Sequence, residues 1–147
     1  MPKSGDFTLK TKKTLAKSVG QRCSNPICRK PTSGPHDDPT KSAIIGVAAH
    51  ITAASEGGQR YNPDLTREQR RSVDNGIWLC QSCAKLIDSD EEHYTEQMLR
   101  DWKRQAEKAQ GDRLEGRRPP LQDRQSLFSL NDGEMLQAIE YYRQSQV

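Results

Sequence analysis

The stretch Asn75-Gly-Ile-Trp-Leu-Cys80-Gln-Ser-Cys83 decides the fold, because it carries a short apolar run directly into two closely spaced cysteines. A second close pair lies earlier in the chain, in the turn-forming stretch Cys23-Ser-Asn-Pro-Ile-Cys28. Two such turns can direct four sulfurs at one ion, and four thiolates are typical of a structural zinc site. Because sulfur would fill every position and leave none for water, the pattern predicts a structural rather than a catalytic zinc.

The composition indicates that the fold needs stabilisation of the kind that a metal site provides. Of the 147 residues, 32% are hydrophobic and 29% are charged, so apolar burial alone is thin for a chain of this length. No apolar run is long enough for a signal peptide or a membrane span, which predicts a cytoplasmic protein with no membrane partner. In that reducing compartment paired cysteines favour metal binding, the alternatives being unrelated buried thiols or two disulfides.

Basic residues gather near the amino terminus. Residues 1–30 contain eight lysines and arginines but a single acid, Asp6. Such a cluster predicts contacts with phosphate groups, and a solvated basic helix face is the alternative.

Apolar periodicity and turn signals predict the secondary structure. In chain order the expected elements are a helix over 6–19, a loop over 31–39, a strand over 43–51, a helix over 66–73, a strand over 77–79, a helical turn over 84–87 and a helix over 95–109. Asp6 or Thr8 is the expected N-cap of the first helix and Gly20 its stop, whereas Thr66 and Gln69 form a predicted capping box. Glycines and prolines predict a linker over 111–120.

His50 lies near the end of the predicted strand over 43–51. A lone histidine on an apolar strand is more often a packed core residue than a catalyst. The predicted zinc changes this expectation, because it ties the two cysteine turns together and brings His50, Asn75 and residues 84–88 near one another.

Several of these residues together resemble a known family. The motif consists of His50-Ile51, Gly57-Gly58, the stretch from Asn75 to Cys83, and Leu86-Ile-Asp88. It resembles the HNH endonucleases from about Thr8 to Trp102, and is most similar to those of bacterial anti-phage defence, including nucleases fused to a sensor domain in cyclic-oligonucleotide signalling (CBASS) systems. The resemblance implies an α+β fold over residues 1–110, a small zinc-stabilised ββα-metal domain (HNH or treble-clef-like) with flanking helices.

The resemblance also implies roles for individual residues. His50 would be the general base that takes a proton from the water attacking a phosphodiester. Asn75 would orient the His50 ring or fix the loop over the site, and it can equally serve a left-handed turn before Gly76.

Two positions depart from the family pattern. The family commonly has an acid or histidine just before its first histidine and a histidine just after its last zinc cysteine, where this chain has Ala49 and Ala84. Asp88 is the first candidate to bind Mg²⁺ or another divalent ion in their place, and Lys85 is a candidate fixed charge for the transition state. Other candidate ligands, or members of a merely solvated acidic turn, are Asp90, Glu91, Glu92 and His93.

The expected function is therefore a metal-dependent endonuclease that hydrolyses DNA with little sequence specificity through backbone contacts. The alternative is a catalytically inactive, zinc-stabilised module that binds nucleic acid or protein. Cutting both strands would suit a homodimer or higher oligomer. The tail, residues 121–147, carries a predicted amphipathic helix from Asn131, which would dock on a partner protein or sensor domain or begin a further domain.

Overall fold

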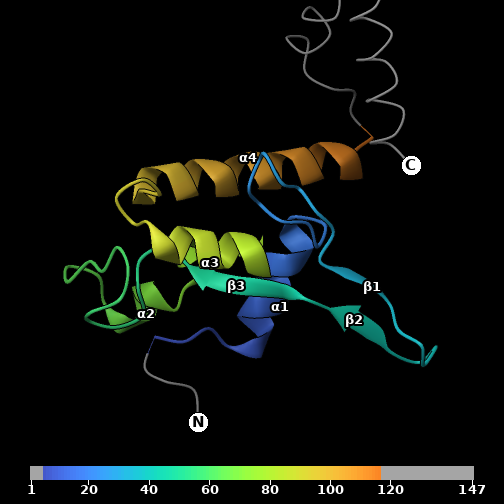
Figure 1. The fold of residues 1–147 in the computed structure, drawn as a ribbon, viewed down its shortest axis with the longest axis horizontal. Coiled ribbons are helices and arrows are strands. Elements are labelled where there is room, and N and C mark those ends of the chain that lie inside the picture. The colour runs from blue at the N-terminus through green and yellow to red at the C-terminus, as the bar shows by residue number, and fades with distance from the viewer. Residues whose placement is uncertain (1–4, 117–147) are drawn as a thin grey trace, which may run out of the picture. The chain divides into compact units, whose positions relative to one another are not determined.

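A computed structural model describes residues 5–116, which form an α+β fold of four α-helices and two small antiparallel sheets (Figure 1). In chain order the elements are α1 (Leu9–Ser18), β1 (Ser33–Pro35), β2 (Ser42–Ile44), β3 (Gly46–His50), α2 (Arg67–Arg70), the 3-10 turn η1 (Val73–Asn75), β4 (Gly76–Cys80), α3 (Gln81–Ser89) and α4 (Glu96–Leu114). Within the same residues, no helix is both long and apolar enough to cross a membrane.

The chain divides into two compact units, Met1–Leu114 and Glu115–Val147. The first unit ends slightly beyond the expected domain boundary, because α4 continues through Gly111 to Leu114. An ion pair of 2.9 Å between Lys108 and Asp112, one turn apart, supports this last part of the helix. Residues 117–120 of the expected linker and the predicted tail, residues 121–147, lie outside the described residues.

Helix α1 begins and ends where local sequence signals place it. The Thr8 hydroxyl accepts a hydrogen bond of 3.2 Å from the Thr11 amide, so Thr8 rather than Asp6 is the N-cap. Beyond the helix, Gly20 takes a φ of +61°, a left-handed conformation that glycine adopts at little cost. Leu15 and Ala16 are buried beneath the helix.

The predicted strand over 43–51 is in fact two strands. Its first part, β2, pairs with β1 in a hairpin arm that occupies much of the expected loop over 31–39, and its second part, β3, pairs with β4. Between them the Ile45 amide donates to the Thr32 carbonyl at 2.7 Å. Directly after this break, a Cβ on Gly46 would lie 2.2 Å from the ring of Trp78, so only glycine lets the backbone pass over that side chain.

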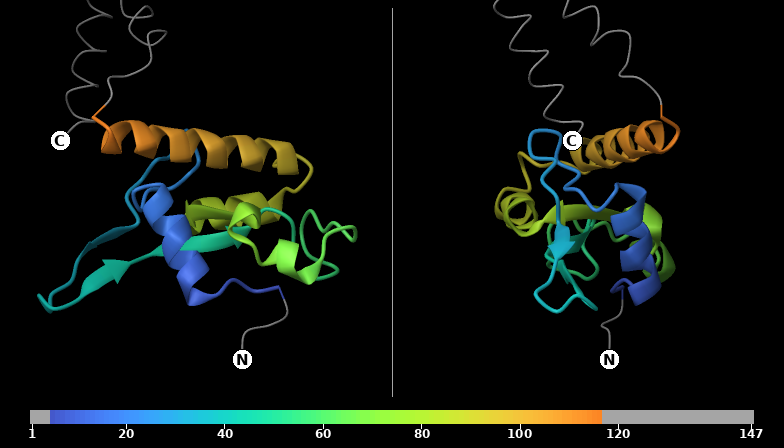
Figure 2. Two further views of the ribbon diagram at one scale, coloured as in Figure 1. Left: turned by 180° about the vertical axis from the view of Figure 1, so that it is seen from behind. Right: turned by 90° about the vertical axis from the view of Figure 1, so that its right-hand side faces the viewer.

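The β3–β4 ribbon is the centre of the domain. Its register pairs Gly46 with Cys80 and His50 with Gly76, and all residues of β4 are buried. The ribbon lies between α1 and α3, with α4 across the top of the view (Figure 2, right). One core cluster therefore joins the cysteines to α3 and α4, and the other joins Phe7 and α1 to Trp78.

Short local motifs connect these layers. The predicted capping box is confirmed, since the Thr66 side chain accepts from the Gln69 amide and the Gln69 side chain accepts from the Thr66 amide. Helix α3 begins at Gln81, earlier than the expected helical turn at 84, because the Cys80 sulfur caps it by accepting from the Cys83 amide at 3.4 Å. The second cysteine pair is therefore part of the start of this helix.

Candidate functional site

The four cysteines form one cluster that can hold a metal ion. The sulfur atoms of Cys23, Cys28, Cys80 and Cys83 all lie within 4.8 Å of one another, and none forms a disulfide. The sulfurs of Cys28 and Cys80 are 3.9 Å apart. A tetrahedral zinc with Zn–S bonds of about 2.3 Å places its sulfurs about 3.8 Å apart, so this spacing fits zinc.

The protein around the sulfurs suits thiolate ligands. Burial raises the pKa of Cys23 to about 11 and also raises the pKa of Cys83, so without an ion both thiols keep their protons at neutral pH. A cation would displace these protons on binding. The Asn25 amide group donates to the Cys83 sulfur at 3.5 Å, and the Ser24 amide donates to the Trp78 carbonyl at 2.9 Å, so the first cysteine turn is already fastened to β4.

His50 is held from the side of the chain's own amino terminus. Its Nε2 lies 2.7 Å from the carbonyl oxygen of Gly5, and its ring stacks on Phe7 with centroids 3.9 Å apart and planes inclined by 10°. Gly5 has a φ of +90°, and a Cβ there would lie 2.6 Å from the Ala54 carbonyl oxygen, so only glycine fits this approach. These contacts fix both the plane and the direction of the imidazole.

The Gly5 contact also decides the tautomer of a neutral His50 ring. A carbonyl oxygen can only accept, so Nε2 carries the proton and Nδ1 keeps the lone pair. Burial lowers the pKa of His50, and the charge of Lys12 adds to this effect, whereas the Gly5 contact and Asp6 oppose it. The ring is therefore neutral at pH 7 and its Nδ1 can accept a proton.

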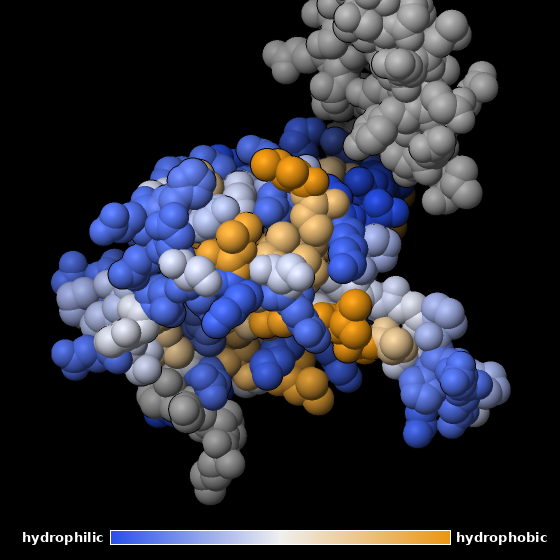
Figure 3. Space-filling model, in the orientation of Figure 1, coloured by the Kyte–Doolittle hydropathy of each residue, from blue (hydrophilic) through white to orange (hydrophobic). Residues whose placement is uncertain are grey.

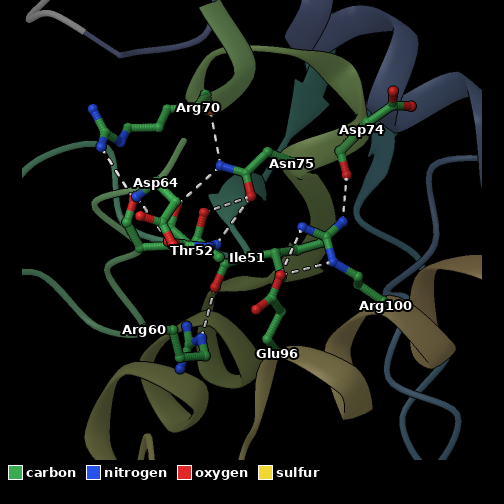
Figure 4. Close-up of polar contacts among 10 residues, drawn as sticks. Ile51, Thr52, Arg60, Asp64, Arg70, Asp74, Asn75, Glu96 and Arg100 are labelled. Carbon is green, nitrogen blue, oxygen red and sulfur yellow. Dashed lines mark hydrogen bonds and ion pairs between the residues drawn. The ribbon is translucent and has the colours of Figure 1, made fainter. Parts of the chain in front are cut away.

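Asn75 fastens the loop that follows His50 (Figure 4). Its Oδ1 accepts from the amide of Thr52 at 3.1 Å and from the hydroxyl of Thr52 at 2.9 Å. Its Nδ2 donates to the carbonyls of Thr52 and Arg70, both at 2.9 Å. The Asn75 side chain therefore serves the loop, one of the two roles considered from the sequence, because these four hydrogen bonds go to Thr52 and to the end of α2 rather than to the His50 ring.

Arg60 reinforces the same loop from its other side. Its guanidinium donates to the carbonyl oxygens of Ile51 at 2.7 Å, Ile87 at 2.9 Å and Tyr94 at 3.3 Å. The Asp88 carboxylate, about half exposed, lies 3.7 Å from Arg60 Nη2, too far for a good hydrogen bond. Arg60 thus joins the residue after His50 to the end of α3, where the candidate ligand Asp88 lies.

Ala49 and Ala84, the two positions that depart from the HNH pattern, occupy one apolar cluster. Ala84 is buried in the core that contains the cysteines, and Ala49 packs against it. Alternation along β3 turns His50 to the opposite face, toward Phe7. Within residues 5–116 the four cysteines are the single group of three or more His, Cys, Asp or Glu side chains close enough to hold an ion.

The other sequence candidates lie on or just after α3. Lys85 is exposed on this helix, beside the buried Ala84. Beyond the helix the Asp90 carboxylate accepts from the His93 amide at 3.2 Å, and Glu91 accepts from the Arg60 amide at 2.9 Å. The first contact lies within the acidic turn that precedes α4, and the second joins this turn to the loop that contains Arg60.

Sequence reasoning missed Gly5, Phe7 and Arg60. Gly5 acts through its backbone carbonyl, which every residue type has. Phe7 was expected inside the first helix, which begins at Leu9. Arg60 carried one usable signal, since it lies beside the Gly57-Gly58 loop. Its φ of +56° is uncommon outside glycine and indicates a backbone held by its surroundings.

No family model matches the chain, and no curated protein matches it significantly in sequence. A functional assignment for this α+β domain therefore rests on its own residues and their geometry.

Proposed function

We propose that this protein is an endonuclease that hydrolyses DNA phosphodiester bonds, with His50 as general base and a structural zinc in the four-cysteine cluster. The observation that carries the proposal is the state of His50. Its ring is neutral, its Nε2 is committed to the Gly5 carbonyl, and its Nδ1 is left to accept a proton. The choice of phosphodiester hydrolysis as the reaction rests on the sequence motif that resembles HNH nucleases.

In this reaction Nδ1 of His50 takes a proton from a water molecule as the water oxygen forms a bond to phosphorus. The phosphorus–oxygen bond to one deoxyribose then breaks, and the leaving oxygen gains a proton from solvent. Phe7 keeps the ring plane fixed during the transfer, and Asn75 keeps the following loop in place. Holding the base in position before the reaction lowers the entropic part of the barrier.

A catalytic ion is the part of the family's chemistry that these residues fit least. The side chains at positions 49 and 84 are alanines in an apolar cluster, and they cannot bind a cation. Asp88 is our proposed single protein ligand, because Mg²⁺ accepts one carboxylate together with water and phosphate oxygens. Such an ion would stabilise the charge on the phosphate, a task to which the exposed Lys85 would also contribute.

The second candidate function is a zinc-stabilised binding module without catalysis. Its specific support is the apolar pair of Ala49 and Ala84. A binding module would use the cysteines and the basic α1 helix but would have no need of a held, neutral His50. The two functions therefore differ in what the loss of His50 does.

The test is the conversion of supercoiled plasmid by zinc-loaded protein, with magnesium, manganese, nickel or no added ion. Comparing His50→Ala with His36→Ala provides a matched pair, because His36 is exposed on the β1–β2 arm and its ring accepts only from the Asp38 amide. We expect His50→Ala to lose nicking and His36→Ala to keep it, and Asp88→Asn to raise the ion concentration required. Equal plasmid binding by both variants with no nicking under any ion would favour the binding module.

A further inference from the structure

A groove lies between α1 and the strands that lead to His50. It has a volume of about 520 Å³. One wall comes from successive turns of α1, and the other comes from β2, β3 and the edge of Trp78. The two walls include Leu9, Lys12, Lys13, Lys17, Ile44 and Ala48.

The wall formed by α1 is positively charged. Lys12, Lys13 and Lys17 line the groove, and Lys10 lies with two of them along the neighbouring face of the helix. The six ion pairs found within residues 5–116 involve none of these four lysines. Their charge is therefore available to an anionic ligand.

The other wall is apolar. Ile44, 60% exposed, lies next to Ile45, 49% exposed, at the point where β2 joins β3. Figure 3 shows hydrophobic surface gathered where the β1–β2 arm meets the body of the domain, whereas the tip of the arm is hydrophilic. The ligand that suits this groove therefore has both anionic and apolar parts.

The groove leads to the proposed base. Ala48 lines it and lies two residues before His50 on the same face of β3. On the helix side, Lys12 lies one turn beyond the Thr8 cap, and Phe7, the residue before that cap, stacks on His50. A polymer lying along α1 would therefore run toward the imidazole.

We propose that this groove binds one unpaired strand of DNA, so that the protein acts on single-stranded or locally opened DNA in preference to intact duplex. The inference rests on the proposed function for its choice of ligand. A duplex keeps its base faces stacked inside and offers phosphates, sugars and base edges, so it has no base face that can pack on the apolar wall. An unpaired strand offers phosphates to the lysines and exposed base faces to Ile44.

The test is fluorescence anisotropy with a labelled 20-nucleotide single strand and with a duplex of the same length, with zinc-loaded protein and no added divalent ion. We expect tighter binding of the single strand. Contacts with Lys12, Lys13 and Lys17 would give a salt dependence, as the slope of log K against log [salt], of about −2.1, from about −0.7 for each contact to a single strand. Lys17→Glu should remove about 0.7 from this slope and weaken single-strand binding several-fold.

Two matched controls make the result specific. Lys108→Glu reverses an exposed lysine on α4, and Ile27→Ser removes an isoleucine that is 93% exposed on the first cysteine turn. We expect Ile44→Ser to weaken single-strand binding and Ile27→Ser to leave it unchanged. Duplex binding as tight as single-strand binding, or equal losses in Lys17→Glu and Lys108→Glu, would overturn the proposal.

This binding experiment and the plasmid assay together distinguish the groove proposal from the proposed nuclease activity. Strong, Lys17-dependent binding of the single strand without His50-dependent cleavage would support the groove proposal and contradict the proposed endonuclease activity. Cleavage of duplex plasmid without selective binding in the groove supports the enzyme and overturns the groove.

Discussion

Replacing Asn75 with alanine should loosen the loop between β3 and β4 more than any other single polar change in the domain. The Asn75 side chain is 2% exposed and makes four hydrogen bonds, all to groups of Thr52 and Arg70. A hydrogen bond contributes about 0.5 to 1.5 kcal/mol net, and a buried group left without a partner costs more. Because water will satisfy part of the opened site, we expect Asn75→Ala to lower the free energy of unfolding by about 3 to 5 kcal/mol.

The assay is urea unfolding of zinc-loaded protein, followed by the fluorescence of Trp78 and Trp102. Asn62→Ala is the matched control, because the Asn62 side chain accepts one exposed hydrogen bond of 2.9 Å from the Asp64 amide. It should cost less than about 1 kcal/mol. If Asn75→Ala costs no more than this control, the account of Asn75 as the fastener of the loop is incorrect.

Three further outcomes follow from the contacts around the site. Removing zinc with a strong chelator, or Cys23→Ser, should abolish cooperative unfolding by circular dichroism, and an unchanged transition would refute a structural ion. Arg60→Met removes three hydrogen bonds to backbone carbonyls and should destabilise the fold by about 2 to 4 kcal/mol in urea, whereas the exposed control Arg67→Met should not. Phe7→Leu should slow nicking by up to about tenfold while zinc content stays the same, because it removes a stack of about 0.5 to 1.5 kcal/mol on His50; an unchanged nicking rate would contradict this.

Local signals in the sequence predicted the cysteine cluster and the ends of several helices. The spacing of Cys80 and Cys83 fixes both sulfurs on one turn, and the cap at Thr8 and the capping box at Thr66 each involve residues within one helical turn. Such features depend on neighbours in the chain, so residue type and spacing are enough to predict them.

Features that depend on distant residues were not predictable in the same way. The break at Ile45 is set by Thr32 and by Trp78 under Gly46, so the apolar run over 43–51 could not indicate where one strand ends and the next begins. The contact of His50 with Gly5 joins residues 45 positions apart in the sequence through a backbone atom. For Asn75 the sequence correctly offered the loop as one of two roles, and the choice required the positions of Thr52 and Arg70.

The dependence of plasmid nicking on pH, measured with a saturating divalent ion, tests the role of His50 most directly. A general base acts only when deprotonated, and burial holds the pKa of His50 below its ordinary value, so the rate should rise with pH through a value below about 6.5 and be level at neutral pH. His36→Ala should reproduce this profile, and His50→Ala should remove the activity at every pH. Activity in His50→Ala with the same acidic limb would contradict the assignment of His50 as the base.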